Sequence, residues 1–346
     1  MNILITGGAG FIGYNAAEHF ARAGRHVHLI DNYCRTGSLE NARDLKKRFP
    51  KILTSSKVDV RHPAQIRRVI ASRKWDAIIH LAGQVAVTTS TRNPRQDFET
   101  NALGTLNILE GMRICASQAL LIFASTNKVY GNLERVKVKK GTRAYFFPQF
   151  ARGIPESVGL DFHSPYGCSK GAADQYIIDY SRIYGLNTVV FRQSCIYGKH
   201  QFGIEDQGWV AWFTIAALYN QPITIFGDGL QARDVLCATD LARLYQLAIE
   251  HKDCVNGKAY NIGGGPANVL SLVQLLEILE KKLDRSITTR CADWRPGDQR
   301  VYVSDLAAIT RDLGWKPDIN YHQGISMLAD WALEQEQQLR KLGLIR

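Results

Sequence analysis

The N-terminus of the chain places a glycine-rich loop between a short apolar strand and a helix. Residues 2–6 (Asn-Ile-Leu-Ile-Thr) are typical of a buried strand, and an Ala-rich helix is expected up to about Ala23. The first glycine permits a tight turn, the second lets the backbone approach a pyrophosphate, and the third lets the helix pack closely with its N-terminus towards the phosphates. The predicted dinucleotide-binding residues of this loop are Gly7, Gly10, Phe11, Ile12 and Gly13.

The second predicted strand, residues 26–30, ends at an acidic residue. Asp31 follows Gly13 by 18 residues, a separation at which a carboxylate can bind both hydroxyls of an adenosine ribose. The same charge would repel the 2′-phosphate of NADP, so the sequence favours NAD. Asn32 lies next to this carboxylate. Arg35 could neutralise a 2′-phosphate, so the preference for NAD is not absolute.

Strands and helices continue to alternate after Asp31. Further strands are expected at residues 52–58, 76–81, 119–124 and 188–192, and helices over residues 64–73, over 94–115 and from Pro165 onwards. Such alternation predicts an α/β fold of Rossmann type, a doubly wound parallel sheet covered on both faces by helices. Ligands of these sheets bind beyond the carboxyl ends of the strands. The residues expected at those ends are Asp59, Val60, Leu81, Ala82, Gln84, Ser125 and Thr126.

The pattern weakens after the sixth strand, which suggests a second and smaller structural part. Residues 1–192 are expected to form the NAD-binding Rossmann domain, and residues 193–346 mainly a discontinuous substrate-binding domain with some segments returning to the Rossmann core. Shorter elements are expected there: strands at 223–226, 233–236 and 260–263, and helices after Gln207 and Asp240 and from about Ser271, Ser304 and Tyr321. Residues 131–164 lack periodicity; a lid or binding loop and a solvated insertion both remain open.

A tyrosine and a lysine lie four residues apart after Pro165. Because four residues make about one helical turn, Tyr166 and Lys170 are expected on one helix face. A neighbouring ammonium group favours the phenolate, so the pair could take and return a proton. With 14 tyrosines and 17 lysines in 346 residues, such a spacing arises roughly once by chance, so the motif needs support from elsewhere in the chain.

Charge and composition narrow the functional classes. The formal charge of +11 suits an anionic small ligand better than nucleic acid, since the basic residues are dispersed and no nucleic-acid motif appears. No apolar run approaches the ~18 residues of a membrane span, and the first residues lack a signal-peptide layout, so a cytoplasmic protein without a membrane association is expected. The seven cysteines are scattered without metal-ligand spacing, so no metal site and no disulfide framework are expected.

Taken together, these motifs resemble the extended short-chain dehydrogenase/reductase family over essentially the whole chain. Within that family the chain is similar to epimerases that act at C2 of a CDP-linked hexose. Four stretches carry this closer similarity: residues 81–86, 125–131, 161–170 and 206–210. Two departures stand out. Cys195 occupies a position where many members have Asn, and residues 134–154 differ most from the related enzymes.

The resemblance implies roles for individual residues. Thr126 would bond the reacting sugar hydroxyl, Tyr166 would take its proton, and Lys170 would hold the nicotinamide ribose and favour the phenolate. Beyond the glycine loop and the catalytic pair, the implied cofactor contacts are Asp31, Asn32, Arg35, Asp59, Val60, Leu81, Ala82, Gln84, Asn101, Ser125 and Gln193. The implied substrate contacts are Gln84, Thr126, Asn127, Cys195, Gln201, Gln207, Gly208, Trp209, Arg233, Arg295 and Asp298.

The resemblance implies an NAD-dependent epimerase that inverts C2 of a CDP-hexose, of the CDP-paratose/CDP-tyvelose or CDP-glucose/CDP-mannose type, through a 2-keto intermediate. A UDP-hexose 4-epimerase is the nearest alternative. A 4,6-dehydratase ranks lower, because its Asp-Glu pair is replaced here by Asn127 and Lys128. A catalytically silent NAD-binding regulatory or nucleic-acid-associated protein is the alternative from another class. A homodimer or homotetramer is expected, with the helices near Pro94 and Pro165 in the interface.

Overall fold

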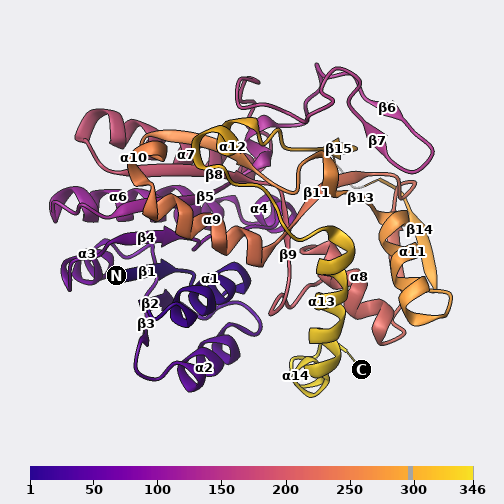
Figure 1. The fold of residues 1–346 in the computed structure, drawn as a ribbon, viewed down its shortest axis with the longest axis horizontal. Coiled ribbons are helices and arrows are strands. Elements are labelled where there is room, and N and C mark those ends of the chain that lie inside the picture. Colours follow the sequence, from indigo (N-terminus) through magenta and orange to yellow (C-terminus); the bar gives the residue numbers. More distant parts are fainter. Residues whose placement is uncertain (295–298, 346) are drawn as a thin grey trace.

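A parallel sheet of seven strands forms the centre of the molecule in the computed structural model, which describes residues 1–294 and 299–345 (Figure 1). From edge to edge the strands are β12 (Lys258–Ile262), β8 (Thr188–Gln193), β5 (Leu120–Thr126), β4 (Ala77–His80), β1 (Asn2–Thr6), β2 (His26–Asp31) and β3 (Leu53–Lys57). All residues of β4 and β8 are buried, as expected for strands covered on both faces. The chain order reverses between β1 and β4, which creates a topological switch point. The predicted Rossmann-type fold is therefore confirmed.

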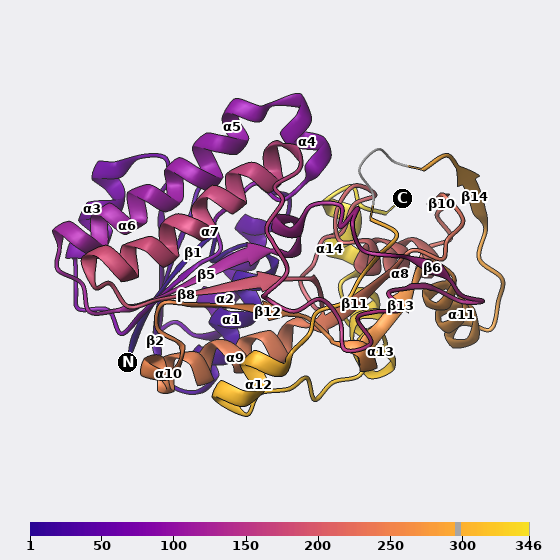
Figure 2. The ribbon, with the colours of Figure 1, turned by 90° about the horizontal axis from the view of Figure 1, so that it is seen from above.

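Helices cover both faces of this sheet (Figure 2). One face packs against α1 (Phe11–Arg22), α2 (Ser38–Arg48), α9 (Ala238–Glu250) and α12 (Ala307–Leu313), with α10 (Lys252–Val255) at its edge. The other face packs against α3 (Pro63–Ala71), α6 (Gly104–Ile114) and α7 (Ser164–Tyr184), and α4 (Val87–Arg92) and α5 (Pro94–Phe98) lie along α7. Helix α7 begins with a proline in its first turn and ends at Gly185, which has the left-handed conformation (φ 67°).

The helix predicted over residues 94–115 is not a continuous α-helix. Asn93 caps α5, and a π-helical turn, η1 (Glu99–Leu103), separates α5 from α6. Such turns shift the register of a helix and are frequent at functional sites. Here the turn carries Asn101, which is almost completely buried and donates a hydrogen bond to Ser169 on α7 (3.0 Å).

The remaining elements form a second layered unit beside the carboxyl ends of the sheet (Figure 1). Strand β11 (Ala232–Cys237) pairs with β9 (Cys195–Tyr197), β13 (Val269–Ser271) and β15 (Val301–Tyr302), and β10 (Ile223–Phe226) pairs with β14 (Thr289–Ala292). The helices of this unit are α8 (Trp209–Leu218), α11 (Leu272–Leu283), α13 (Tyr321–Glu334) and α14 (Glu336–Lys341), with the short 3₁₀ turn η3 (Pro266–Asn268). An apolar core of its own joins α8, α11 and α13.

The aperiodic segment after β5 is folded onto the second unit. It begins with the 3₁₀ turn η2 (Asn127–Tyr130) and contains a small hairpin, β6 (Lys139–Lys140) and β7 (Tyr145–Phe146). The backbone N–H of Tyr145 donates to Leu230, and Ile154 bridges to Ser304. Tyr145 and Ile154 belong to an apolar cluster shared with β11 and β15. The segment is therefore a packed part of the molecule rather than a fully solvated insertion.

The cysteines and the lengths of the helices bear on two further expectations. All seven cysteines are free thiols. Within residues 1–294 and 299–345, none of the helices combines the length and the apolar character that crossing a bilayer would require.

Candidate active site

A cavity of about 410 Å³ opens at the switch point, at the carboxyl ends of the strands. The glycine loop, the ends of β2, β4 and β5, the start of α7 and the segment after β8 form its walls. The predicted site residues that line it are Gly7, Gly10, Phe11, Ile12, Gly13, Asp31, Asn32, Arg35, Val60, Leu81, Ala82, Ser125, Thr126, Tyr166, Lys170, Gln193, Cys195, Gln201, Gln207 and Gly208. Residues far apart in the sequence thus meet in one cavity.

The glycine loop is shaped by contacts that only glycine permits. Gly7 has a positive φ of 63°, and a Cβ atom on it would lie 2.7 Å from the backbone nitrogen of Ala82. A Cβ atom on Gly13 would lie 2.5 Å from the carbonyl oxygen of Gly7. These contacts hold the start of α1 close to the ends of β1 and β4, and Gly10 caps the helix without a side chain of its own. The uncapped N–H groups of α1 and the free space beside the loop fit a dinucleotide pyrophosphate.

The carboxylate of Asp31 lies at the end of β2 and faces the same cavity. Its oxygens accept backbone hydrogen bonds from Ala9 (3.1 Å) and Tyr33 (2.8 Å). Burial raises the pKa of Asp31, although these hydrogen bonds and the charge of Arg35 oppose the rise. A carboxylate oxygen can accept more than one hydrogen bond, so both oxygens keep capacity for a diol. Arg35 hydrogen-bonds the Gln207 side chain, so it joins β2 to the segment after β8.

Thr126, Tyr166 and Lys170 meet at the opposite end of the cavity. The Thr126 hydroxyl hydrogen-bonds the Tyr166 phenol, and it also accepts from the backbone N–H of Lys128 (3.2 Å). The Lys170 ammonium group donates to the carbonyl of Ala124 (2.5 Å) and lies 4.0 Å above the centre of the Phe123 ring. The three side chains are buried, so a proton transferred here would be shielded from bulk water.

The expectation that Lys170 lowers the pKa of the tyrosine is not met. Burial raises the pKa of Tyr166 to about 12, although the hydrogen bond from Thr126 opposes the rise. Burial lowers the pKa of Lys170 to about 7, although Asp174 and Asp97 oppose the fall. Desolvation disfavours the charged form of both groups and is the largest cause of both pKa shifts in this packed site.

A buried polar network joins the catalytic helix α7 to strands β5 and β8. Arg192 on β8 binds Asp174 on α7 through two hydrogen bonds (3.0 and 2.9 Å), and the side chains are 6% and 0% exposed. Ser125 donates to the same carboxylate (2.7 Å). Arg192 also donates to the hydroxyl of Tyr130 (3.1 Å). The predicted cofactor residue Ser125 thus reaches the cavity while its hydroxyl is held by α7.

Several predicted site residues do not line the cavity. Asp59 instead binds Arg61 through the guanidinium Nε (3.0 Å) and Nη2 (2.8 Å). Gln84 and Asn101 bind one another through backbone and side-chain groups (2.9 and 3.0 Å) behind the wall formed by the loop after β4. Asn127, Trp209 and Arg233 also lie outside the lining. Asn127 donates to Gln299, Trp209 donates to Cys195, and Arg233 donates to the carbonyls of Ala232 and Gln299. The predicted substrate contacts Arg295 and Asp298 lie outside the described residues.

Cys195 and Gln201 show how the cavity ends near the second unit. The thiol of Cys195 accepts a hydrogen bond from the indole N–H of Trp209 (3.0 Å), and burial raises its pKa. Gln201 is 9% exposed, and its Oε1 atom has no hydrogen-bond partner within the described residues. A Cβ atom on Gly208 would lie 2.7 Å from its Nε2 atom. An unpaired buried acceptor is costly, so this atom is suited to accept from a ligand.

Other lining residues were not found from the sequence. Asn41 on α2 donates to the carbonyl of Ala9 (3.1 Å) and hydrogen-bonds His200 (3.1 Å), which stacks on Tyr14 with ring centres 3.5 Å apart. Phe202 packs so closely on Gly37 that a Cβ atom there would overlap its ring. The segment after β9, which carries His200 and Phe202, therefore packs against α1 and the start of α2 beside the cavity. The sequence signal was the glycine at position 37, just before α2, because its φ of 80° is one that few other residues adopt.

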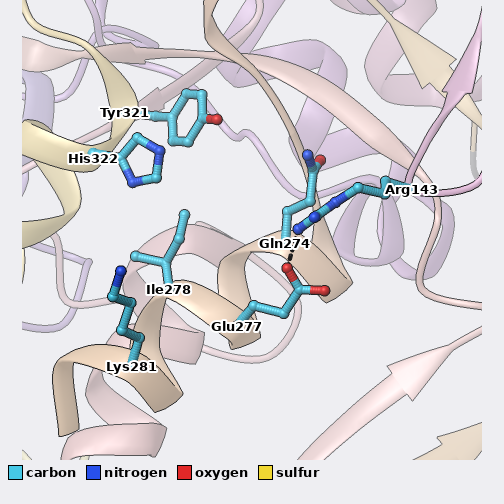
Figure 3. A pocket seen from close by; sticks show the side chains of 7 residues that line it. All are labelled: Arg143, Gln274, Glu277, Ile278, Lys281, Tyr321 and His322. Atoms are coloured by element: carbon cyan, nitrogen blue, oxygen red, sulfur yellow. Dashed lines mark hydrogen bonds and ion pairs between the residues drawn. The ribbon is translucent and has the colours of Figure 1, made fainter.

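A second cavity lies in the other unit and contains none of the predicted residues (Figure 3). It has a volume of about 500 Å³ and is formed by α11, the start of α13 and the turn between β6 and β7. An ion pair between Arg143 and Glu277 spans one side of it, and Tyr321 and His322 stand opposite in Figure 3. Of these two cavities, only the first is lined by predicted site residues.

Comparisons with known proteins show the family of the chain. The profile of the family described as GDP-mannose 4,6 dehydratase matches residues 4–328. A CDP-paratose 2-epimerase of Salmonella typhi is 44% identical over 336 residues, which cover 96% of this chain and 99% of that protein. A dTDP-glucose 4,6-dehydratase of Neisseria meningitidis is 32% identical and covers 96% of this chain and 94% of its own length.

A solved structure shows the same fold. The UDP-glucose 4-epimerase of Thermus thermophilus, in complex with NAD, superimposes with a TM-score of 0.81 at 30% identity, over 96% of this chain and 99% of that one. The family match and these relatives extend over nearly the whole chain. The chain belongs to the GDP-mannose 4,6-dehydratase family, within the extended short-chain dehydrogenases/reductases.

Proposed function

We propose that this protein is an NAD-dependent sugar-nucleotide epimerase that inverts C2 of a CDP-hexose. The observation that carries the proposal is the 44% identity to a CDP-paratose 2-epimerase along 96% of the chain. The meeting of Thr126, Tyr166 and Lys170 in one cavity with the glycine loop supports it. The CDP-paratose/CDP-tyvelose and CDP-glucose/CDP-mannose pairs are the substrates to be tried.

The cavity fits NAD at one end and leaves the catalytic residues at the other. Gly7, Gly10 and Gly13 would hold the pyrophosphate, and Asp31 the adenosine ribose. NAD, when bound, supplies the acceptor and donor of a hydride in a reaction without net oxidation. Lys170 would bind the nicotinamide ribose from its position beside Ala124.

The proton transfers are assigned to this chain's own side chains. Tyr166 would remove the proton of the C2 hydroxyl, and Thr126 would donate a hydrogen bond that favours the phenolate. The resulting 2-keto sugar turns its other face within the site, and Tyr166 returns the proton to the oxygen. Because the reaction changes only the configuration at C2, the protein must position the sugar and supplies no further reagent.

A dehydratase is the weaker reading although the family profile carries that name. Elimination requires carboxylic acids that move protons beside the sugar. The two positions after Thr126 hold Asn127, whose amide donates to Gln299 (3.3 Å), and Lys128. Neither side chain is a carboxylic acid, so the general acid of elimination is missing at these positions.

Epimerisation at C4 of a UDP-hexose uses the same three catalytic residues and is the nearest alternative. The carbon oxidised depends on how the nucleotide and sugar are held relative to the tyrosine. A CDP-hexose deuterated at C2 decides between the two. We expect inversion at C2 with the label retained on C2, no effect of a C4 label, and faster turnover of CDP-hexoses than of UDP-glucose. A rate that responds to deuterium at C4, or preferred turnover of UDP-glucose, would assign the enzyme to C4. Loss of the C2 label to water would imply enolisation instead.

We also propose that the protein assembles as a homodimer or a homotetramer through α6 and α7. Large apolar side chains are exposed on these helices and the adjoining α5. They are Phe98, Ile114, Tyr176, Ile183 and Tyr184. Light scattering should give a mass of two or four chains, and Ile183→Glu should lower it. A monomer at micromolar concentration would contradict the assembly without affecting the proposed chemistry.

A further inference from the structure

A buried carboxylate that no motif singled out lies behind the catalytic helix. Asp97 is at the end of α5 and is 1% exposed. Figure 2 shows α4, α5 and α7 side by side on the same face of the sheet. Burying a carboxylate is costly unless it is fully hydrogen-bonded, so its partners indicate what it holds in place.

The three partners of Asp97 come from three different parts of the site. Gln84, in the loop after β4, donates through Nε2 to Oδ1 (2.8 Å). Asn101, on the π-helical turn η1, donates through Nδ2 to the same oxygen (3.2 Å). Ser169, on α7, donates through its hydroxyl to Oδ2 (2.5 Å). The carboxylate therefore joins the cavity wall, the π turn and the catalytic helix.

Ser169 is placed so that this bond reaches the catalytic pair. It lies between Tyr166 and Lys170 on α7, and its hydroxyl also lies 3.2 Å from the carbonyl oxygen of Tyr166. The loop that Gln84 belongs to contributes Leu81 and Ala82 to the cavity. A shift of Asp97 would thus move the wall and the catalytic turn relative to each other.

The partners of Asp97 differ in charge from those of Asp174, the other acid that acts on Lys170. Asp174 is paired with Arg192 in an ion pair, whereas the partners of Asp97 are two amides and a hydroxyl. His80 lies at the end of β4 and is kept neutral, because burial and the charge of Lys170 lower its pKa to about 3. Burial lowers the pKa of Lys170, and Asp174 and, to a smaller extent, Asp97 oppose the fall; Asp97 also adds to the rise that burial causes in the pKa of Tyr166.

We propose that Asp97 is a positioning residue: it anchors the turn that carries Tyr166 and Lys170 to the cavity wall, and its negative charge stabilises the buried ammonium group of Lys170. This inference rests on the proposed function, since it takes Tyr166 and Lys170 as the acid/base pair. A carboxylate at this position accepts from all three donors at once, from Gln84 and Asn101 through Oδ1 and from Ser169 through Oδ2.

The test removes the charge and separately removes one hydrogen bond. Asp97→Asn keeps the size of the side chain and loses the charge, whereas the control Ser169→Ala loses one hydrogen bond and keeps the charge. Lysines labelled with ¹³C at Cε report ionisation by NMR in the protein without substrate, and Lys170→Arg assigns the resonance. We expect Lys170 to titrate near pH 7 in the parent protein, at lower pH in Asp97→Asn, and at its parental pH in Ser169→Ala.

Activity gives a second readout. We expect Asp97→Asn to lower kcat about 10–100-fold with little change in KM, because a buried hydrogen-bonded acceptor is lost, and to shift the pH–rate profile to lower pH. Ser169→Ala should lower kcat without shifting the profile. An unmoved Lys170 titration and an unmoved profile in Asp97→Asn would overturn the proposal. Should this variant not fold, Asp97→Ser removes the same charge. If the parent protein fails to invert CDP-hexoses while the titration still moves, the proposed function fails and the role of Asp97 stands.

Discussion

Replacement of Asp31 by alanine tests the cofactor end of the cavity. The carboxylate accepts backbone N–H groups from Ala9 at 3.1 Å and from Tyr33 at 2.8 Å, and since an ionised carboxylate has about four acceptor sites, capacity remains for the ribose hydroxyls. Hydrogen bonds to a charged group contribute about 1.5–3 kcal/mol each. Since water replaces part of the loss, Asp31→Ala should weaken NAD binding by about 3 kcal/mol, or about a hundredfold in Kd.

Asp59 provides a matched control for this experiment. It is also an acid that follows a strand, β3, yet its carboxylate does not line the cavity and is held by Arg61, with a longer bond from Asn32 (3.1 Å). Asp59→Ala should therefore change the Kd for NAD less than about threefold, which corresponds to less than about 0.7 kcal/mol. Calorimetric titration of cofactor-stripped protein with NAD and with NADP measures both variants. Unchanged NAD affinity in Asp31→Ala, or NADP bound as tightly as NAD by the parent protein, would refute the reasoning.

Two further predictions concern the catalytic pair. Tyr166→Phe keeps the ring and removes the proton acceptor, so epimerisation should fall about 10²–10⁴-fold while bound NAD is retained; near-normal turnover would contradict the assignment. The pKa of Lys170 is lowered from 10.5 to about 7 on folding, so above pH 7 the unfolded chain holds the proton that the folded chain has lost, and the contribution of this lysine to stability rises between about pH 7 and 10.5. Lys170→Met should remove that rise, which is on the order of 5 kcal/mol, as measured by denaturant unfolding at several pH values; an equal pH dependence in both proteins would show that folding does not lower the pKa of Lys170.

The alternation of strands and helices was enough to predict the central sheet. Runs such as residues 2–6 and 188–192 are apolar on both sides of the strand, and this pattern is a direct consequence of burial between two helix layers. The predicted strands at 26–30 and 223–226 likewise match β2 and β10 to within a residue. The parallel orientation of the strands could also be predicted, because parallel strands need a crossover connection, which is usually a helix.

Other elements leave little trace in the sequence. Helix α2 is not predicted because its buried face consists of Ser38, Asn41, Ala42 and Leu45, of which only two are apolar. Strand β9 has three residues and exists only because β11 pairs with it. The π turn η1 is also not predicted, because its apolar spacing differs little from that of an α-helix. This turn nevertheless determines that Asn101 reaches Ser169.

The site shows the same division between backbone position and side-chain direction. Sequence order predicts that Gln84 and Asp59 reach the carboxyl edge of the sheet, because the loops after β4 and β3 end there. It does not predict that Asp59 is bound by Arg61, two residues later, or that Gln84 turns away from the cavity to Asp97. Side chains with local partners take those partners first, so a polar residue at this edge becomes a ligand contact only when its neighbours leave it unpaired.

Electrostatics depend on packing more strongly still. The four-residue spacing placed Tyr166 and Lys170 on one face of α7, yet burial of both groups raises the pKa of the tyrosine and lowers that of the lysine, opposite to the expectation for an exposed pair. The buried carboxylates then set how far each shift goes. Asp174 raises the pKa of Lys170 more than Asp97 does, although Asp174 is held by an arginine and Asp97 is surrounded by neutral donors. A sequence motif therefore identifies which groups exchange protons, and the charges packed behind them determine the pH at which they do so.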